Sequence, residues 1–452
     1  MTPILSICIP TLNRSDLLSV LLENLEQQVG EHLEKIEIVV ADNASRDDTE
    51  SVVKNCKLPI VYGKQNKTVG FAKNLLFATT KLASGSFVWV IGDDDLILPG
   101  GLNNILDSID RAPQVDYHYL NFSWIDYKLR SRIIKEFGGH PSKYWLERLQ
   151  FKESEWKLLN RLEDLTYIAS DNISAVFSGI FCFVTRRQFY IDALDILRPS
   201  DSLDGSSTLI DDCFPHSKLA LPRVAGKEIA FIGMPCFMQG VSAWEWGAYA
   251  NKNMIFGTHQ FFEWLETTAF AKDALERLWQ SYYKMAGKLF FRMLYYRDEH
   301  KGLDIVLEKA IPESSKNIVF WDSFMEESKL NMDVDHDARN LSDWVTQLVN
   351  ENPSARLGLW GIAGRGHRFI KFTPQLLNNL VWIADREVLL SGAEVEGTQL
   401  LISETASLIN ANLDVLVIGT RKQFVAEIIA EASTVLKPEA SIVSIQGIYA
   451  QK

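Results

Sequence analysis

The fold is decided by the stretch Phe87-Val88-Trp89-Val90-Ile91-Gly92-Asp93-Asp94-Asp95. Its apolar half indicates a buried strand, and the three carboxylates put dense negative charge at the end of that strand. Adjacent carboxylates repel one another unless a cation neutralises them. Oxygen ligands of this kind suit Mg²⁺ or Mn²⁺ that bridges to phosphates. An acidic turn ahead of a helix is the structural alternative.

Three strand-and-helix units precede this stretch. Residues 5–10, 36–40 and 59–62 each predict a short buried strand, and a helical pattern follows each of them. Strands that alternate with helices predict a parallel sheet with helices on both faces. The polar clusters that end the strands should therefore meet at one edge of the sheet, which is where open α/β sheets bind ligands.

Two of the helix starts carry recognisable capping residues. Ser15 is the expected N-cap of a helix whose leucines at 17, 18, 21, 22 and 25 lie on one face. The sequence Ser45-Arg46-Asp47-Asp48 resembles a capping box with Asp in place of Glu. A third helix is expected to open at Gly70 and to run to about residue 83.

Four motifs in this order resemble the donor half of family 2 glycosyltransferases, which have the GT-A fold. They are Pro10-Thr11-x-Asn13-Arg14, Asp42-Asn43-Ala44-Ser45-x-Asp47-Asp48-Thr49, Gly70-x-Ala72-Lys73-Asn74 and Asp93-Asp94-Asp95. The resemblance is close over residues 4–110 and looser over residues 111–245. Each motif alone is weak, but the four together are specific.

The resemblance implies a donor site and a metal site. The residues expected to bind the nucleotide sugar are Pro10, Thr11, Asn13, Arg14, Asp42, Asn43, Gly70, Lys73, Asn74, Asp93 and Asp94. Asp42 would receive the base, and the expected ligands of Mn²⁺ or Mg²⁺ are Asp95, Asp94 and Asp93. The family often reads Asp-x-Asp-Asp, whereas Gly92 stands here in place of the first Asp. Which of the three carboxylates holds the metal therefore stays open.

The second half of the resemblance should supply a catalytic base. Residues 174–184 predict a strand with a glycine kink, and Arg186-Arg187 stands at an expected helix start. The pair Asp211-Asp212 lies where the family has its Glu-Asp motif, which implies Asp212 as the base and Asp211 as its neighbour or an acceptor contact. By themselves, two carboxylates at a helix N-terminus are explained by the helix dipole. His216 is either a further metal or phosphate contact or a structural residue.

Four further residues are expected at the acceptor or in a lid. Ser178 and Gly179 lie in the kinked strand, and Trp244 and Trp246 lie in the loop 240–247. Tryptophan faces stack on pyranose rings, so this loop is expected either to close over a sugar or to act as a hydrophobic hinge.

The pattern predicts three regions: a GT-A α/β domain over 1–250, a helical aromatic-rich segment over 251–350 and a small Rossmann-like α/β domain over 351–452. The helical segment has a broad apolar face beside five cations, Arg277, Lys284, Lys288, Arg292 and Arg297. Two explanations of this face are possible. It packs against the core or against a second subunit of a homo-oligomer, or it makes peripheral contact with an anionic membrane. In the last region the turn spacing G-x-x-G-x-G misses the dinucleotide fingerprint, which favours a scaffolding role over a bound cofactor.

Composition excludes several classes of protein. The net charge is −12, so binding of nucleic acid through a basic field is not expected. The five cysteines are scattered, which predicts buried thiols in a reducing compartment. No run approaches 18 apolar residues, so neither a membrane span nor a signal peptide is expected. The expected location is the cytoplasm, including the inner face of the membrane.

The sequence as a whole predicts a metal-dependent, inverting glycosyltransferase of family 2. It would move a sugar from a nucleoside diphosphate sugar to a saccharide or lipid-linked acceptor in surface polysaccharide biosynthesis. A sugar nucleotidyltransferase with the GT-A fold is one alternative, although the turn at residues 10–14 is a poor triphosphate cradle. A carbohydrate-binding or scaffold protein with a degenerate site is the other, and Gly92 is the residue that raises it.

Overall fold

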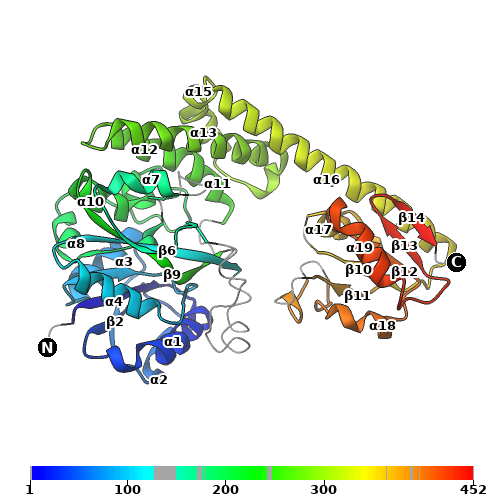
Figure 1. Ribbon diagram of the computed structural model, residues 1–452, viewed down its shortest axis with the longest axis horizontal. Coiled ribbons are helices and arrows are strands. Elements are labelled where there is room, and N and C mark those ends of the chain that lie inside the picture. Colours follow the sequence, from blue (N-terminus) through cyan, green and yellow to red (C-terminus); the bar gives the residue numbers. More distant parts are fainter. Residues whose placement is uncertain are drawn as a thin grey trace. The chain divides into compact units, whose positions relative to one another are not determined.

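The computed structural model describes residues 3–126, 149–169, 176–177, 179–241, 247–362, 364–386, 390–395 and 398–450. Its contacts divide the chain into two compact units, Met1–Met325 and Glu326–Lys452. Each unit is built around its own sheet, and both sheets lie among helices in Figure 1. The mixed α/β architecture predicted from the sequence is confirmed.

The first unit contains a nine-stranded sheet in the order β3-β2-β1-β4-β8-β6-β9-β5, with β7 paired to β9. Strands β1 to β4 pair in parallel with one another, whereas β8 runs antiparallel to both β4 and β6. The strands are β1 (Leu5–Thr11), β2 (Ile36–Asp42), β3 (Ile60–Lys64), β4 (Phe87–Val90), β5 (Leu96–Ile97), β6 (Tyr117–Asp126), β7 (Trp156–Leu159), β8 (Phe183–Arg186) and β9 (Ile229–Val241). Strands β1, β2 and β4 are almost wholly buried, which fits their near-continuous apolar sequences.

The helices of the sheet domain connect these strands and cover the sheet (Figure 1). They are α1 (Ser15–Val29), α2 (Thr49–Asn55), α3 (Phe71–Leu76), α4 (Gly101–Arg111), α7 (Leu165–Ile168), α8 (Gln188–Ala193), α9 (Ile210–Cys213) and α10 (Pro215–Val224). A wider helical turn over Phe77–Leu82 continues α3, so the third predicted helix has nearly its expected length. Leu18, Leu21, Leu22 and Leu25 of α1 are buried, as the leucine spacing predicts.

Two capping predictions were wrong. Ser15 is the first residue of α1 and caps nothing; its backbone N–H instead donates to Asp47 Oδ2 at 2.8 Å. The expected capping box does not form either, because α2 begins at Thr49, whose N–H and hydroxyl both donate to Asp47 Oδ1. A single carboxylate, Asp47, therefore serves the starts of two helices that neighbour each other on the sheet.

The predicted strand over 174–184 is much shorter in the structure. Of the described residues, Ile180–Cys182 form a single 3-10 turn, and the strand β8 begins only at Phe183. Arg186 belongs to this strand, so α8 begins at Gln188, two residues after the predicted start. The turn at 180–182 breaks the strand beside the ligand edge of the sheet, which is where Phe181 enters a cavity described below.

A helical segment follows the sheet. It comprises α11 (Ala250–Lys252), α12 (Thr258–Glu266), α13 (Lys272–Tyr295), α14 (Leu303–Lys309), α15 (Ile311–Ser314) and α16 (Ile318–Glu351), and the helices α11 to α13 gather on one side of the sheet domain in Figure 1. The apolar face of α13 is buried at Leu278, Tyr282, Phe290 and Met293, which belong to the core of the first unit. Packing therefore accounts for most of the stripe that the sequence shows.

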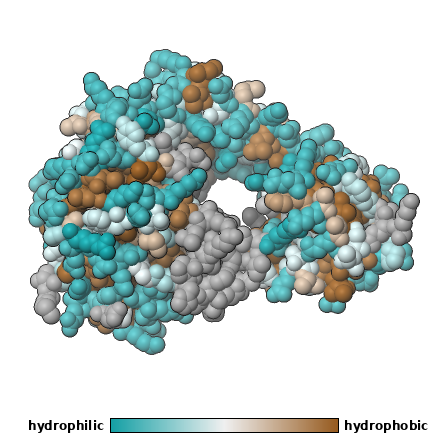
Figure 2. Space-filling model, viewed as in Figure 1, coloured by the Kyte–Doolittle hydropathy of each residue, from teal (hydrophilic) through white to brown (hydrophobic). Residues whose placement is uncertain are grey.

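Contact with a membrane surface is one of the predictions for the helical segment. On the face drawn in Figure 2, hydrophilic residues cover most of the helical segment, with smaller hydrophobic areas between them. Among the residues that the structure describes, no helix is both long enough and apolar enough to cross a bilayer. Contact with a membrane surface and oligomer formation stay predictions.

The second unit is a Rossmann-like sheet in the order β11-β10-β12-β13-β14, parallel except for the last strand. Its elements are β10 (Leu357–Trp360), α17 (Arg365–Phe372), β11 (Leu380–Ala384), α18 (Leu408–Ala411), β12 (Val415–Ile418), α19 (Lys422–Ala432), β13 (Ser441–Ser444) and β14 (Gly447–Ala450). Leu341, Val345 and Val349 of α16 pack into the same core as Leu357 of β10. The packing unit thus begins at Glu326, earlier than the predicted domain boundary at 351, because the end of α16 supplies one face of its core.

Gly366 is the residue on which the glycine-rich turn of this unit depends. A Cβ at this position would lie 1.8 Å from the carbonyl oxygen of Gly361, which belongs to the backbone and has no alternative position. We expect Gly366→Ala to lower the free energy of unfolding of the second unit by about 1–3 kcal/mol, the usual cost of overpacking. Urea unfolding followed by circular dichroism measures this, and an unchanged midpoint would show that the turn relaxes freely.

Candidate active site

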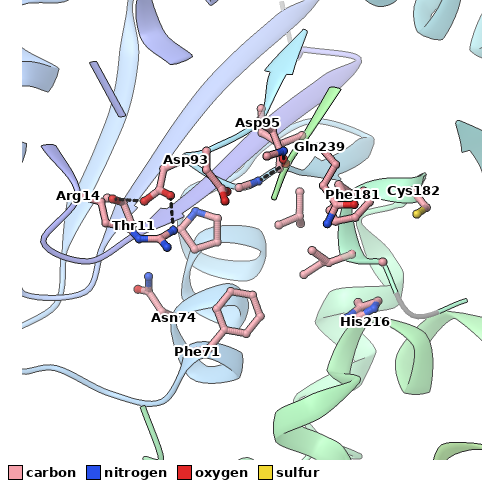
Figure 3. A pocket seen from close by; sticks show the side chains of 18 of the residues that line it. Thr11, Arg14, Phe71, Asn74, Asp93, Asp95, Phe181, Cys182, His216 and Gln239 are labelled. Carbon is pink, nitrogen blue, oxygen red and sulfur yellow. Dashed lines mark hydrogen bonds and ion pairs between the residues drawn. The ribbon is translucent and has the colours of Figure 1, made fainter. Parts of the chain in front are cut away.

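The predicted ligand edge of the sheet forms where β1, β2 and β4 end together. Thr11 is paired with Asp42 in register, and the acidic stretch follows β4 on the other side of β1. Asp93 Oδ2 accepts a hydrogen bond from the Thr11 hydroxyl at 2.8 Å (Figure 3). Asp93 Oδ1 forms an ion pair with Arg14 Nη1 at 2.7 Å. Because Asp93 is only 2% exposed, removing Arg14 would leave a buried charge without its cation.

Asp95 holds the edge to a distant strand. Its Oδ2 accepts the backbone N–H of Gly92 at 2.7 Å, and its Oδ1 accepts the N–H of Gly240, in β9, at 3.0 Å. The carboxylate is 2% exposed, so these bonds form in a dry environment and fix the turn after β4 against β9. The geometry makes Asp95 a positioning residue for the acidic turn.

Asp94 is the carboxylate that a side chain at position 92 would meet first. A Cβ on Gly92 would stand 2.5 Å from Asp94 Oδ1, closer than real Cβ contacts come. Asp94 lines a cavity at this edge and is 9% exposed. The glycine that departs from the family pattern therefore leaves the space that the Asp94 carboxylate occupies.

The cavity has a volume of about 370 Å³ and two chemically different walls. The described residues of the first wall come from the ends of β1, β2 and β4 and from α3, and they include Pro10, Thr11, Arg14, Asn43, Phe71, Asn74, Asp93, Asp94 and Asp95. The sequence predicted all of these except Phe71. The prediction that the motifs meet at one place on the sheet edge agrees with this geometry.

Of the second wall, the sequence indicated only Gly179 and His216. It brings together described residues from β6, the turn before β8, the loop before α9, the end of α9, the start of α10, the end of β9 and the helical turn at 253–257. They include Phe122, Trp124, Phe181, Cys182, Leu203, Cys213, Phe214, His216, Gln239 and Met254. Several of these side chains face the acidic turn across the cavity in Figure 3. Burial raises the pKa of the Cys213 thiol to about 11 and the pKa of Cys182 further still, so both remain neutral thiols.

Four predicted donor residues lie outside the cavity lining. Asp42 has no exposed surface; it accepts the Ser45 N–H at 2.7 Å and the Tyr62 hydroxyl at 2.6 Å. Burial, and then the bond to Asp42, raise the pKa of Tyr62, so this phenol stays protonated as the donor. Asn13, with φ of 53°, receives the Arg46 N–H at its side-chain oxygen. Both residues shape the turns beside the cavity.

Gly70 and Lys73 hold a loop from the second half of the unit. Lys73 Nζ lies 2.8 Å from Asp201 Oδ1, and a Cβ on Gly70 would stand 2.3 Å from the Ser200 carbonyl oxygen. This contact brings the loop 199–209, whose Leu203 lines the cavity, against the start of α3. The two predicted donor residues thus fix the position of that loop.

The acidic pair also faces this loop. Asp212 accepts hydrogen bonds from the backbone N–H of Ser200 at 2.8 Å and from the hydroxyls of Ser200 and Ser207. Asp211, which is 7% exposed, accepts the Arg198 N–H at 2.7 Å and pairs with Lys218. Neither carboxylate lines the cavity, whereas the two residues that follow them in the chain, Cys213 and Phe214, do.

The predicted acceptor or lid residues are only partly placed. Gly179 lines the cavity beside the turn at 180–182. Ser178, Trp244 and Trp246 lie outside the described residues. Their roles stay predictions.

The acidic turn fits a divalent cation such as Mg²⁺, which takes only one or two of its ligands from the protein. Among the described residues, no group of three His, Cys, Asp or Glu side chains is arranged to hold a metal ion by itself. Mg²⁺ and similar ions are commonly held by only one or two carboxylates, with phosphates and water completing the octahedron. Asp94, at the cavity wall, with Asp93 beside it, matches that pattern, and the buried oxygens are hard ligands of the right type.

The known proteins that this chain resembles are glycosyltransferases. Residues 6–187 match the model of the family described as glycosyl transferase family 2. Over 218 residues the chain is 27% identical to the abequosyltransferase RfbV of Salmonella typhimurium, covering 47% of this chain and 59% of that protein. Over 141 residues it is 36% identical to a GalNAc(5)-diNAcBac-PP-undecaprenol beta-1,3-glucosyltransferase of Campylobacter jejuni, covering 30% and 43%.

A solved structure is also similar to this chain. The crystal structure of residues 1–349 of S. aureus TarS in complex with UDP-GlcNAc aligns with a TM-score of 0.43 and 17% identity, covering 65% of this chain and 73% of that one. The chain spans less than two thirds of the length of both curated relatives.

Proposed function

From the premise that the chain carries a glycosyl transferase family 2 domain over residues 6–187, we propose that the protein is a metal-dependent, inverting glycosyltransferase. It moves a sugar from a nucleoside diphosphate sugar to a hydroxyl of a saccharide or lipid-linked acceptor in surface polysaccharide assembly. The observation that carries this proposal is the cavity whose lining includes both the acidic turn and Cys213 and Phe214, the two residues after Asp212. The names of the two curated relatives support the class of reaction.

The first wall of the cavity is the proposed donor site. Arg14 is a guanidinium with several donors in a fixed fork, 20% exposed, at the edge of the cavity beside Asp93. Such a group pairs well with phosphate oxygens. Asn74 Oδ1 is buried at the same wall and accepts no hydrogen bond from the described residues, so a hydroxyl or amino group of the donor is its natural partner.

We assign the metal primarily to Asp94, with Asp93 beside it, and Asp95 to the support of the turn. When bound, Mn²⁺ or Mg²⁺ would neutralise the diphosphate leaving group and so stabilise its departure. Asp95 contributes by holding the turn through its two backbone bonds, which keeps Asp94 at the cavity wall.

Asp212 is the proposed general base. The acceptor hydroxyl attacks the anomeric carbon as the bond from that carbon to the phosphate oxygen breaks, and the hydroxyl proton passes to the carboxylate. Attack on the face opposite the leaving group inverts the anomeric centre. The hydroxyls of Ser200 and Ser207 now donate to this carboxylate, so an acceptor hydroxyl would take the place of a hydrogen-bond donor that the site already accommodates.

Two other functions make different products. A sugar nucleotidyltransferase would release pyrophosphate from a nucleoside triphosphate and a sugar phosphate, and a carbohydrate-binding scaffold would release nothing. The short turn that carries Arg14 has no glycine-rich loop to hold a triphosphate, and Arg14 pairs with Asp93. Both observations favour the transferase over the nucleotidyltransferase.

Nucleotide binding tests the proposal. A thermal-shift screen of UDP, GDP, CDP and TDP sugars, each with and without Mn²⁺, should give at least one donor that raises the melting temperature only when the ion is present. Ligands that bind the native state raise its apparent stability by mass action. No shift with any nucleotide sugar, or a shift with nucleoside triphosphates alone, would contradict the transferase.

Gly92 gives a prediction about the acidic turn. Because the Cβ of an alanine would displace Asp94 Oδ1, we expect Gly92→Ala to weaken donor binding in the presence of Mn²⁺ by roughly tenfold or more. Donor binding without the ion should hardly change. Titration calorimetry under both conditions measures the two affinities, and an equal loss in both would mean that the substitution disturbs the nucleotide site directly.

A further inference from the structure

The second wall of the cavity carries information about the donor sugar, on the basis of the function proposed above. If the diphosphate is held near Asp94 and the acceptor hydroxyl near Asp212, the sugar ring must lie between them. The cavity spans this interval, since its lining runs from Asp94 to Cys213 and Phe214, the residues that directly follow Asp212.

The described lining of this interval is mainly apolar. Phe122, Trp124, Phe181, Phe214, Leu203 and Met254 supply aromatic or aliphatic surface. Phe122 and Phe214 are 2% and 1% exposed, and Phe122 is packed against Trp124, Phe181 and Phe237, so these rings cannot turn away to admit water. Figure 3 shows Phe181 and His216 on the side opposite Asp93.

Few described groups on this wall can pair with sugar hydroxyls. The thiols of Cys182 and Cys213 are weak hydrogen-bonding groups. Gln239 Oε1 is buried and accepts no hydrogen bond from the described residues, so it offers one acceptor to the sugar. Among the described residues, His216, 3% exposed and in ring contact with Phe183 and Phe214, and the indole N–H of Trp124 are the other polar groups of this wall.

Against this wall, a fully hydroxylated hexose would bury more hydroxyls than these groups can pair, and an unpaired buried hydroxyl is unfavourable. A methyl or methylene group in place of a hydroxyl would instead remove apolar surface from water. We propose that the donor is the nucleoside diphosphate ester of a deoxy sugar, a 6-deoxyhexose or a dideoxyhexose. Gln239 binds one of its remaining hydroxyls.

The test uses the full-length protein in two steps. Metal-dependent binding of UDP, GDP, CDP and TDP first identifies the base. Donor hydrolysis is then compared within pairs that share that base and differ only in the sugar, such as UDP-glucose with UDP-6-deoxyglucose, GDP-mannose with GDP-6-deoxymannose, and CDP-glucose with CDP-3,6-dideoxyglucose. We expect kcat/KM to favour the deoxy member by roughly tenfold to a hundredfold, the range in which an apolar pocket discriminates against an added hydroxyl.

Substitutions then place the discrimination in this wall. Leu203→Gln and Met254→Gln add a hydrogen-bonding group at partly exposed positions and should reduce the preference several-fold. Leu194→Gln is the matched control, since Leu194 is 43% exposed and does not line the cavity, and it should leave the preference unchanged. Gln239→Leu should lower kcat/KM for both members of a pair.

The outcomes separate this inference from the function on which it rests. If nucleoside diphosphates bind with metal but the hydroxylated hexose is used as well as or better than its deoxy partner, the deoxy-sugar inference is overturned and the transferase stands. If no nucleoside diphosphate binds, the transferase itself is overturned. A preference that survives in Leu203→Gln and Met254→Gln together would place the discrimination elsewhere and overturn the role of this wall.

Discussion

Asp212→Asn will bind the nucleoside diphosphate sugar with nearly unchanged affinity and turn it over roughly a hundredfold or more slowly, because it removes the proton acceptor. The amide oxygen of asparagine can still accept the hydroxyls of Ser200 and Ser207, whereas its NH2 group loses the bond from the Ser200 N–H. The loop 199–209 should keep its position, because Lys73 still pairs with Asp201 and Gly70 still lies against Ser200. Steady-state kinetics with saturating donor, together with calorimetric donor affinity, measure the two effects separately.

If Asp212 had only a structural role, a different result would be expected. If the carboxylate served only to hold the loop, the double variant Ser200→Ala with Ser207→Ala would lose as much turnover as Asp212→Asn. We expect the double variant to keep most of its turnover, whereas Asp212→Asn should lose roughly a hundredfold or more. Equal losses in the two variants, or normal turnover in Asp212→Asn, would move the base to Asp211 or elsewhere.

The second large effect concerns the acidic turn. Asp94→Asn should weaken donor binding by roughly a hundredfold in the presence of Mn²⁺ and leave the much weaker metal-free binding almost unchanged. Asp107→Asn, which removes the same charge from an exposed position of α4 away from the cavity, is the matched control and should behave like the unmodified protein. Donor titrations at several Mn²⁺ concentrations give both affinities.

Asp93 and Asp95 should respond differently from Asp94. Asp93 holds Arg14 and Thr11, and Asp95 holds the N–H groups of Gly92 and Gly240, so their asparagine variants disturb protein contacts whether or not metal is present. We expect a loss of thermal stability in both variants without ligand. Identical metal-specific losses in all three would contradict the division of roles within the acidic turn.

Much of the fold and one wall of the site could be predicted because their signals are local. The strand β4 and its acidic end are contiguous in the chain, and parallel pairing of β1 with β2 and β4 is implied by the alternation of strands and helices. Thr11, Arg14 and Asp93 therefore meet as expected, although they come from segments about 80 residues apart.

Apart from Gly179 and His216, the second wall could not be predicted, for the opposite reason. Gln239 becomes a neighbour of the acidic turn through the pairing of β9 with β5, and Phe122 through the pairing of β6 with β9. The paired residues are more than 100 positions apart and show no motif. Phe181 enters the cavity because the chain turns at 180–182, where the apolar pattern predicts a continuous strand. The capping errors at Ser15 and Ser45 have a similar cause, since Asp47 serves both helix starts through a tertiary contact.

The central claim is that this chain uses the cavity beside Asp94 to transfer a sugar from a nucleoside diphosphate. Its most direct test is the release of nucleoside diphosphate from a bound nucleotide sugar, measured with Mn²⁺, with the ion removed by EDTA, and in Asp94→Asn. We predict release with Mn²⁺ in the unmodified protein and at most about a hundredth of that rate in the other two cases. Release at the same rate in all three, or release of pyrophosphate in place of the nucleoside diphosphate, would contradict the account.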